Sequence, residues 1–130
     1  MAMVSPSKGE TMLEALALSA VLASGPLVEA TQEERAFLEC VAHRESRNDP
    51  KARNARSSAA GTYQFLTRTW QGNAKWAKWK GTYPARPYDQ AHKAPAWVQH
   101  LVALHSIRRG GWAHWYYAGS RCNSLGRALP

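Results

Sequence analysis

Carboxylates are scarce in most of this 130-residue chain. Residues 1–45 hold 7 acidic and 3 basic side chains, whereas residues 46–130 hold 2 acidic and 14 basic ones. Acid–base chemistry by a carboxylate in the larger part must therefore use Glu45, at the boundary, or Asp49 or Asp89 beyond it. The strong positive charge attracts polyanions, and nucleic acid, an anionic membrane and an acidic cell-wall polymer all fit this description.

Cysteines are also few. Cys40 and Cys122 cannot make a disulfide framework, and they do not have the C-x-x-C spacing of a metal or redox site. One bridge would close a loop of about 80 residues and contribute about 4 kcal/mol in an oxidising compartment, and two buried thiols are the alternative. The five histidines form no His-x-x-x-His pair and there is no glycine-rich phosphate loop, so we expect neither metal nor cofactor.

Long apolar runs are missing too. A membrane span needs about 20 apolar residues, and no run in this chain is that long. Residues 1–30 are predicted to form an apolar N-terminal helix that opens on the capping box Thr11-x-x-Glu14 and ends at Ser24-Gly25-Pro26. We interpret it as a retained segment that anchors or packs, in contact with a membrane or with proteins of a virion or envelope complex. A cleaved signal peptide is the alternative, because Val28-Glu29-Ala30 fits a cleavage site.

The clearest helix signal covers residues 31–46, within a domain predicted over residues 31–130. Thr31-x-x-Glu34 is a second capping box, and Asp49-Pro50 stops the helix.

Glu45 lies on the apolar stripe of this helix, because Phe37, Val41 and Glu45 follow one another at intervals of four residues. An apolar surrounding and the negative end of the helix dipole both raise the pKa of a carboxyl, as a general acid near neutral pH requires. A simple pair with Arg44 or Arg47 is the alternative.

Three motifs follow one another in an informative order. Glu45-Ser46 ends the helix, Ala60-Gly61-Thr62-Tyr63-Gln64-Phe65 follows a polar loop, and Trp115-Tyr116-Tyr117-Ala118-Gly119-Ser120 comes later. This arrangement resembles the lysozyme-like superfamily, particularly soluble lytic transglycosylases, resuscitation-promoting factors and the endolysin of phage lambda. The second motif is similar to the family's Gly-Leu-Met-Gln segment, and the third to its Ala-Tyr-Asn-Ala-Gly-Pro box, with Tyr117 in place of the Asn.

The resemblance implies an α+β fold that is mostly α: a single lysozyme-like domain with a small irregular or β element near residues 53–66 and the extra N-terminal helix. It makes Glu45 the catalytic residue. Substrate-binding positions are then expected at Ser46, Ser58, Gly61, Tyr63, Gln64 and Tyr116. Alternatives are core packing for the aromatic rings, a turn amide for Gln64 and backbone capping for the loop serines. Gly111-Trp112-Ala113-His114-Trp115 and Cys122 also resemble the resuscitation factors, whose terminal cysteine bridges back to the catalytic helix.

Glycoside hydrolysis normally uses two carboxylates, and only Asp49 lies close to Glu45 in the sequence. The resemblance therefore favours a lytic transglycosylase acting on peptidoglycan strands in the envelope or outside the cell, where a single Glu serves as acid and then as base. Hydrolysis with a water placed by Asp49 stays open. An alternative of another class is a non-catalytic protein of a phage particle or secretion complex with the same fold. A further alternative is a nucleic-acid-binding module, and we do not favour nucleic acid as a partner.

Two further patterns concern the rest of the chain. Three tryptophans and three lysines in residues 70–80 form a basic aromatic patch that suits stacking and phosphate contacts, or else tryptophans packed beneath solvated lysines. Residues 95–108 are predicted to form a helix with a core stripe that includes Trp97, and Asp89 is predicted to cap a helix that begins near Gln90.

Overall fold

A computed structural model describes residues 25–111, Trp115, Cys122 and Asn123. Its elements in chain order are η1 (Pro26–Glu29), α2 (Gln32–Ser46), α3 (Thr67–Ala74), η2 (Ala91–Lys93), α4 (Ala96–Ser106) and η3 (Ile107–Gly111). Within this described part, β structure consists of isolated bridges that join Arg53 to Ala60, Ala60 to Phe65 and Trp79 to Thr82. The predicted class, mostly helical with a small β element near residues 53–66, is confirmed.

The start of α2 is fixed by local chemistry. Thr31 Oγ1 accepts a hydrogen bond from the Glu34 backbone N at 3.0 Å, and Glu34 Oε1 accepts one from Thr31 N at 2.9 Å, which confirms the predicted capping box. The helix ends at Ser46 because Arg47 takes a left-handed conformation with φ 53°. The chain thus leaves the helix before it reaches Pro50.

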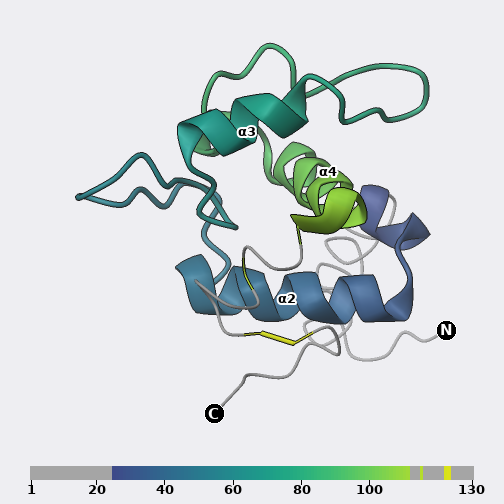
Figure 1. Cartoon of the computed structure of the whole chain (residues 1–130), viewed down its shortest axis with the longest axis horizontal. Helices are drawn as coiled ribbons and strands as arrows, with labels where there is room; N and C mark the ends of the chain where they lie inside the picture. The colour runs from purple at the N-terminus through teal and green to yellow at the C-terminus, as the bar shows by residue number, and fades with distance from the viewer. Residues whose placement is uncertain (1–24, 112–114, 116–121, 124–130) are drawn as a thin grey trace, which may run out of the picture.

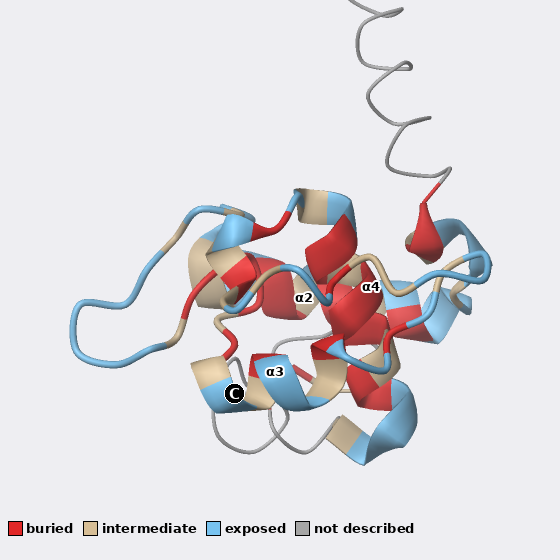
Figure 2. Ribbon diagram, turned by 90° about the horizontal axis from the view of Figure 1, so that it is seen from above, coloured by how far each residue is buried: buried red, intermediate tan, exposed pale blue. Residues whose placement is uncertain are grey.

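The helices pack around one aromatic core. In Figure 1, α4 lies between α2 and α3, and it contacts both. Figure 2 shows that the buried residues gather where the helices face one another. The largest fully buried rings are those of Phe37, Tyr63, Phe65, Trp70 and Trp115.

Two long-range links tie α2 to later parts of the chain. Arg108 donates from Nε to Glu34 Oε2 at 2.8 Å and from Nη2 to Oε1 at 2.9 Å, a bidentate pair. A disulfide joins Cys40 to Cys122, with their Cα atoms 6.0 Å apart. The two cysteines are therefore a bridge, and not free thiols, in this structure.

Two local predictions are wrong. Asp89 does not cap a helix: its Oδ1 pairs with Lys93 Nζ at 3.1 Å, and the 3-10 turn that follows has no side-chain cap. Trp97, predicted to belong to the core stripe of residues 95–108, is 37% exposed and is not part of the buried core. The expected N-terminal helix falls mainly on residues 1–24, outside the described residues. Among the helices that the structure does describe, each is too short or too polar to cross a bilayer.

Candidate functional site

Glu45 lies in the last turn of α2 and is half-buried. Burial raises the pKa of its carboxyl above the ordinary value. Over the described ranges, no ion pair joins Glu45 to Arg44 or Arg47, both of which are exposed. A carboxyl that is desolvated and not held by a cation keeps its proton to higher pH, so it can act as a proton donor.

Ser46 connects the end of α2 to the loop that follows. Its hydroxyl donates to the Thr62 carbonyl at 2.7 Å and accepts a hydrogen bond from Asp49 N at 3.0 Å. The Thr62 carbonyl is the nearer of two acceptors, the other being the Ala42 carbonyl at 3.3 Å, so Ser46 links the loop to the end of α2 that carries Glu45.

The segment after this loop is a tight turn. Ala60 and Phe65 exchange two backbone hydrogen bonds of 3.0 Å, and Gly61 (φ 81°) and Gln64 (φ 54°) both have left-handed backbone conformations between them. The Gln64 amide donates to the Gly61 carbonyl at 3.0 Å, and to that of Ala52 at 3.5 Å. The Gln64 side chain therefore closes the turn in this structure.

Gln99, on α4, anchors the same turn and was not singled out from the sequence. It is fully buried, accepts a hydrogen bond from Thr62 N at 2.7 Å, and donates to the carbonyls of Pro50 and Ala94 at 2.9 Å each. A Cβ at Gly61 would lie 2.4 Å from Gln99 Oε1, so only glycine fits there. The available signal was an amide within an apolar helix, since a buried amide needs partners.

Tyr63 is 1% exposed and packs in the core beside Phe65 and Trp115. Its hydroxyl forms a 2.5 Å hydrogen bond with His100 Nδ1, and its carbonyl accepts one from Trp115 Nε1 at 3.1 Å. Burial raises the pKa of Tyr63 and lowers the pKa of His100 to about 4, so both groups are neutral at neutral pH. Tyr63 therefore anchors the turn to the aromatic core.

The remaining predicted site residues are more peripheral. Ser58 is exposed, and its hydroxyl accepts a hydrogen bond from Thr67 N at 3.1 Å, at the start of α3. Asp49 is exposed, and its Oδ1 accepts a hydrogen bond from Lys51 N at 2.9 Å, which closes an Asx turn. Tyr116 lies outside the described residues.

A hollow of about 580 Å³ lies between η1, α2 and α4, with Tyr63 and His100 in its wall. Glu39 and His43 also line it, whereas Glu45 does not. Within the described ranges, no group of three His, Cys, Asp or Glu side chains could hold a metal ion.

Comparison with known proteins finds staphylococcal relatives. The chain is 42% identical over 83 residues to the protein named "Probable transglycosylase SceD" of Staphylococcus aureus strain Newman, and equally to that of strains Mu3 / ATCC 700698 and USA300. The alignment covers 64% of this chain and 32% of each relative, so the chain spans about a third of the length of the curated relatives it matches. No family model matches the chain, and no solved structure matches it.

Proposed function

We propose that this chain cleaves peptidoglycan glycan strands as a lytic transglycosylase, with Glu45 as its single acid and base. The observation that carries the proposal is the half-buried Glu45 carboxyl, whose pKa is raised by burial, at the end of a helix joined by Ser46 to the Gly61–Phe65 turn. Similarity to a protein named as a probable transglycosylase supports the same reaction class.

The proposed reaction breaks the β-1,4 bond between N-acetylmuramic acid and N-acetylglucosamine. Protonated Glu45 gives its proton to the leaving oxygen, and the substrate's own acetamide stabilises the positive centre at C1. The Glu45 carboxylate then takes the proton from the muramyl 6-hydroxyl, whose oxygen bonds to C1. Glu45 ends protonated, and the product is a 1,6-anhydro sugar.

One carboxylate is enough for this route, which accords with the shortage of acids around Glu45. Asp49 is the nearest acid in the sequence beyond it, and its Oδ1 already closes the turn at Lys51. Inverting hydrolysis would need a second carboxylate about 6.5 to 9.5 Å from the first. Because one Asp49 oxygen is engaged in its own turn, we propose the route that needs Glu45 alone.

Purified sacculi digested with wild-type protein and with Glu45→Gln test the proposal. Loss of a general acid lowers the rate about 10²- to 10⁴-fold, while Glu33→Gln, at an exposed position in the first turn of the same helix, should retain the rate. Mass spectrometry should find anhydro ends on the released muropeptides. Equal cleavage by wild type and Glu45→Gln would contradict the catalytic role, and reducing ends in place of anhydro ends would indicate hydrolysis.

The proposed place of action is the cell envelope or the outside of the cell. The Cys40–Cys122 disulfide supports an oxidising compartment, because the cytosol keeps most thiols reduced. Attachment to a virion or an envelope complex through residues 1–30 stays a prediction from the sequence.

A further inference from the structure

Residues 66–88 form a strongly basic segment on the surface. The segment contains five Lys and Arg side chains and no Asp or Glu. All five basic residues are exposed: Arg68, Lys75, Lys78, Lys80 and Arg86. No acid within the segment neutralises them, so it presents a continuous positive field to a partner.

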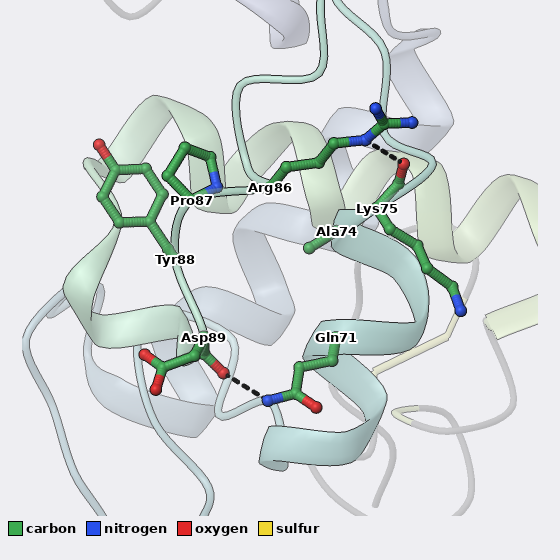
Figure 3. A pocket seen from close by; sticks show the side chains of 7 residues that line it. All are labelled: Gln71, Ala74, Lys75, Arg86, Pro87, Tyr88 and Asp89. Atoms are coloured by element: carbon green, nitrogen blue, oxygen red, sulfur yellow. Dashed lines mark hydrogen bonds between the residues drawn. The ribbon is translucent and has the colours of Figure 1, made fainter.

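Arg86 is held in place and is ready to bind an anion. Its Nε donates to the Lys75 carbonyl at 2.9 Å, and its guanidinium lies 3.7 Å from the centre of the Tyr83 ring. Figure 3 shows the Arg86 side chain extending past the end of α3, with its terminal nitrogens directed away from Gln71 and Asp89. Within the part of the chain that the structure describes, they make no hydrogen bond. A fixed guanidinium fork loses little entropy when it binds the oxygens of a phosphate.

A hollow of about 320 Å³ lies beside Arg86, between α3 and residues 86–89. Figure 3 shows Gln71 and Asp89 at one end of it, joined by a 3.2 Å hydrogen bond from the Gln71 amide to the Asp89 carbonyl. The carboxylate of Asp89 pairs with Lys93, which offsets its repulsion of an anion. Lys75 and Arg86 lie at the other end, and Figure 3 shows their charged groups directed away from the hollow, so both cations face the surface beside it.

The aromatic rings of the segment favour a polyanion without bases. Lys75 lies over the Trp76 ring at 5.9 Å, Lys80 over the Trp79 ring at 5.5 Å and Arg86 over the Tyr83 ring at 3.7 Å, so each of these rings already has a cation over one face. Trp70 is buried. Binding of single-stranded nucleic acid relies on several free rings on which successive bases stack. In this segment Trp76, 54% exposed, is the ring most open to solvent, and the side of its indole that faces solvent can pack on a sugar or polyol beside Lys75.

The basic segment lies away from Glu45. In Figure 1 the loop after α3 lies at the upper right, whereas residues 53–60 project to the left above the C-terminal end of α2. A polymer bound to the basic segment therefore leaves the Glu45 end of the molecule open.

We propose that residues 66–88 form an accessory site for a phosphodiester-linked polyol or sugar polymer that is attached to peptidoglycan. This proposal rests on the proposed function, which brings the chain to the wall. Lys75 and Arg86 bind phosphates beside the hollow, Lys78 and Lys80 extend the positive track, and Trp76 packs on the polyol or sugar unit. The site holds the protein on wall that carries such polymers.

The test measures how tightly the Glu45→Gln protein binds to two preparations of sacculi. This variant is used so that cleavage does not interfere with the binding measurement. One preparation keeps its phosphate polymers, and the other has lost them by treatment with cold hydrofluoric acid. We expect about tenfold tighter binding to the first at low salt, with most of this difference lost in high salt. Equal binding to both preparations would overturn the proposal.

Charge-matched variants locate the site. Lys75→Gln/Arg86→Gln should remove most of the preference for untreated sacculi. Lys78→Gln/Lys80→Gln, which leaves the hydrogen bond between Arg86 and Lys75 intact, should weaken the preference severalfold. The control Arg35→Gln/Arg109→Gln loses the same charge at exposed positions outside the segment and should change binding less than about twofold. Equal losses in all three variants would mean that only net charge matters, which contradicts a defined site.

Two further measurements separate the alternatives. The first is competition, in which single-stranded DNA or free wall polymer displaces the protein from sacculi. If DNA displaced the protein at the same phosphate concentration as the wall polymer, the segment would be assigned to nucleic acid instead. Wild-type cleavage of the hydrofluoric-acid-treated sacculi reports the proposed function alone. If this cleavage fails while polymer-dependent binding persists, the reaction is wrong and the accessory site stands.

Discussion

Glu45 combines two properties at the scale of a single residue. It follows Phe37 and Val41 on one face of α2, both fully buried, yet it is itself only half-buried. Burial therefore raises its pKa without removing the side chain from solvent. The position of a titratable group at the edge of a core explains how one carboxyl can be proton donor and, after donation, proton acceptor.

The first prediction concerns pH. Because the pKa of Glu45 is raised in the folded protein, the proton-donating form persists above the ordinary value of 4.5, and kcat/KM should fall as pH rises through the raised pKa. The folded state also holds this proton more tightly than the unfolded chain does. The free energy of unfolding should accordingly fall as pH rises from 4.5 to the raised pKa.

Rate profiles with soluble glycan fragments and denaturant titrations across this pH range measure both effects. Glu45→Gln should remove the contribution of this group to the pH dependence of stability. A rate that instead increases steadily from acidic to alkaline pH would mean that Glu45 does not act as an acid.

The second prediction concerns Gly61. Gly61→Ala should lower the free energy of unfolding by about 2 to 4 kcal/mol, because alanine is strained at φ 81° and its Cβ would lie 2.4 Å from Gln99 Oε1. Gly81→Ala is the matched control: φ is 83° there, but nothing lies within 4 Å of the added Cβ. It should cost about 1 to 2 kcal/mol. Urea titrations measure the free energy of unfolding of both variants. The same loss in both would mean that the contact with Gln99 adds no cost.

At the scale of elements, local patterns were sufficient for α2 and insufficient for the loop after it. The capping box at Thr31 and Glu34 depends on residues three apart, so it can be predicted from the sequence. The helix end could not be placed as well, because Arg47 ends it in a left-handed conformation three residues before Pro50. Its position follows from hydrogen bonds such as that from Ser46 to Thr62, which join distant residues.

Gln99 shows the same limit more sharply. Its neighbours in the sequence indicate a helix with an apolar face. Nothing in that pattern indicates that the side-chain amide donates a hydrogen bond to the carbonyl of Pro50, 49 residues earlier. Sequence reasoning could place Glu45 at the end of a helix on its apolar side, since this helix is locally encoded. The residues that hold the turn beside it could be found only once α4 was packed against the loop.

The third prediction tests this anchoring. Gln99→Met keeps the approximate volume but leaves Thr62 N and the Pro50 carbonyl without their partner, so we expect a loss of about 2 to 4 kcal/mol in the free energy of unfolding. Gln32→Met, at an exposed position in the first turn of α2, should change it by less than about 0.5 kcal/mol. Thermal and urea unfolding of both variants measure the difference, and similar values would mean that the buried amide stabilises nothing.

At the scale of the whole molecule, α2 is the element on which distant segments converge. Glu34, in its first turn, binds Arg108 after α4, and Cys40, in its middle, binds Cys122 near the end of the chain. Both links close long stretches of chain onto the helix that presents Glu45. The last segment of the chain is thus tied to α2 covalently, five residues before the proposed catalytic residue.

The fourth prediction follows from this link. The two cysteines lie 82 residues apart, and a cross-link over so long a loop restricts the unfolded chain by about 4 kcal/mol in the chain-entropy model. Cys40→Ala/Cys122→Ala should therefore unfold at a markedly lower urea concentration than the oxidised wild type. Wild type treated with a reductant should approach the variant, because both then lack the cross-link.

Cleavage of sacculi, measured well below the unfolding midpoint of each form, separates stability from positioning. If the bond acts only on the unfolded chain, the reduced and oxidised proteins cleave at equal rates per folded molecule. If it also holds the end of the chain against α2 beside Glu45, the reduced protein is slower even where it is fully folded. An unchanged urea midpoint after complete reduction would contradict the predicted stabilisation, because neither state of the chain would then depend on the cross-link.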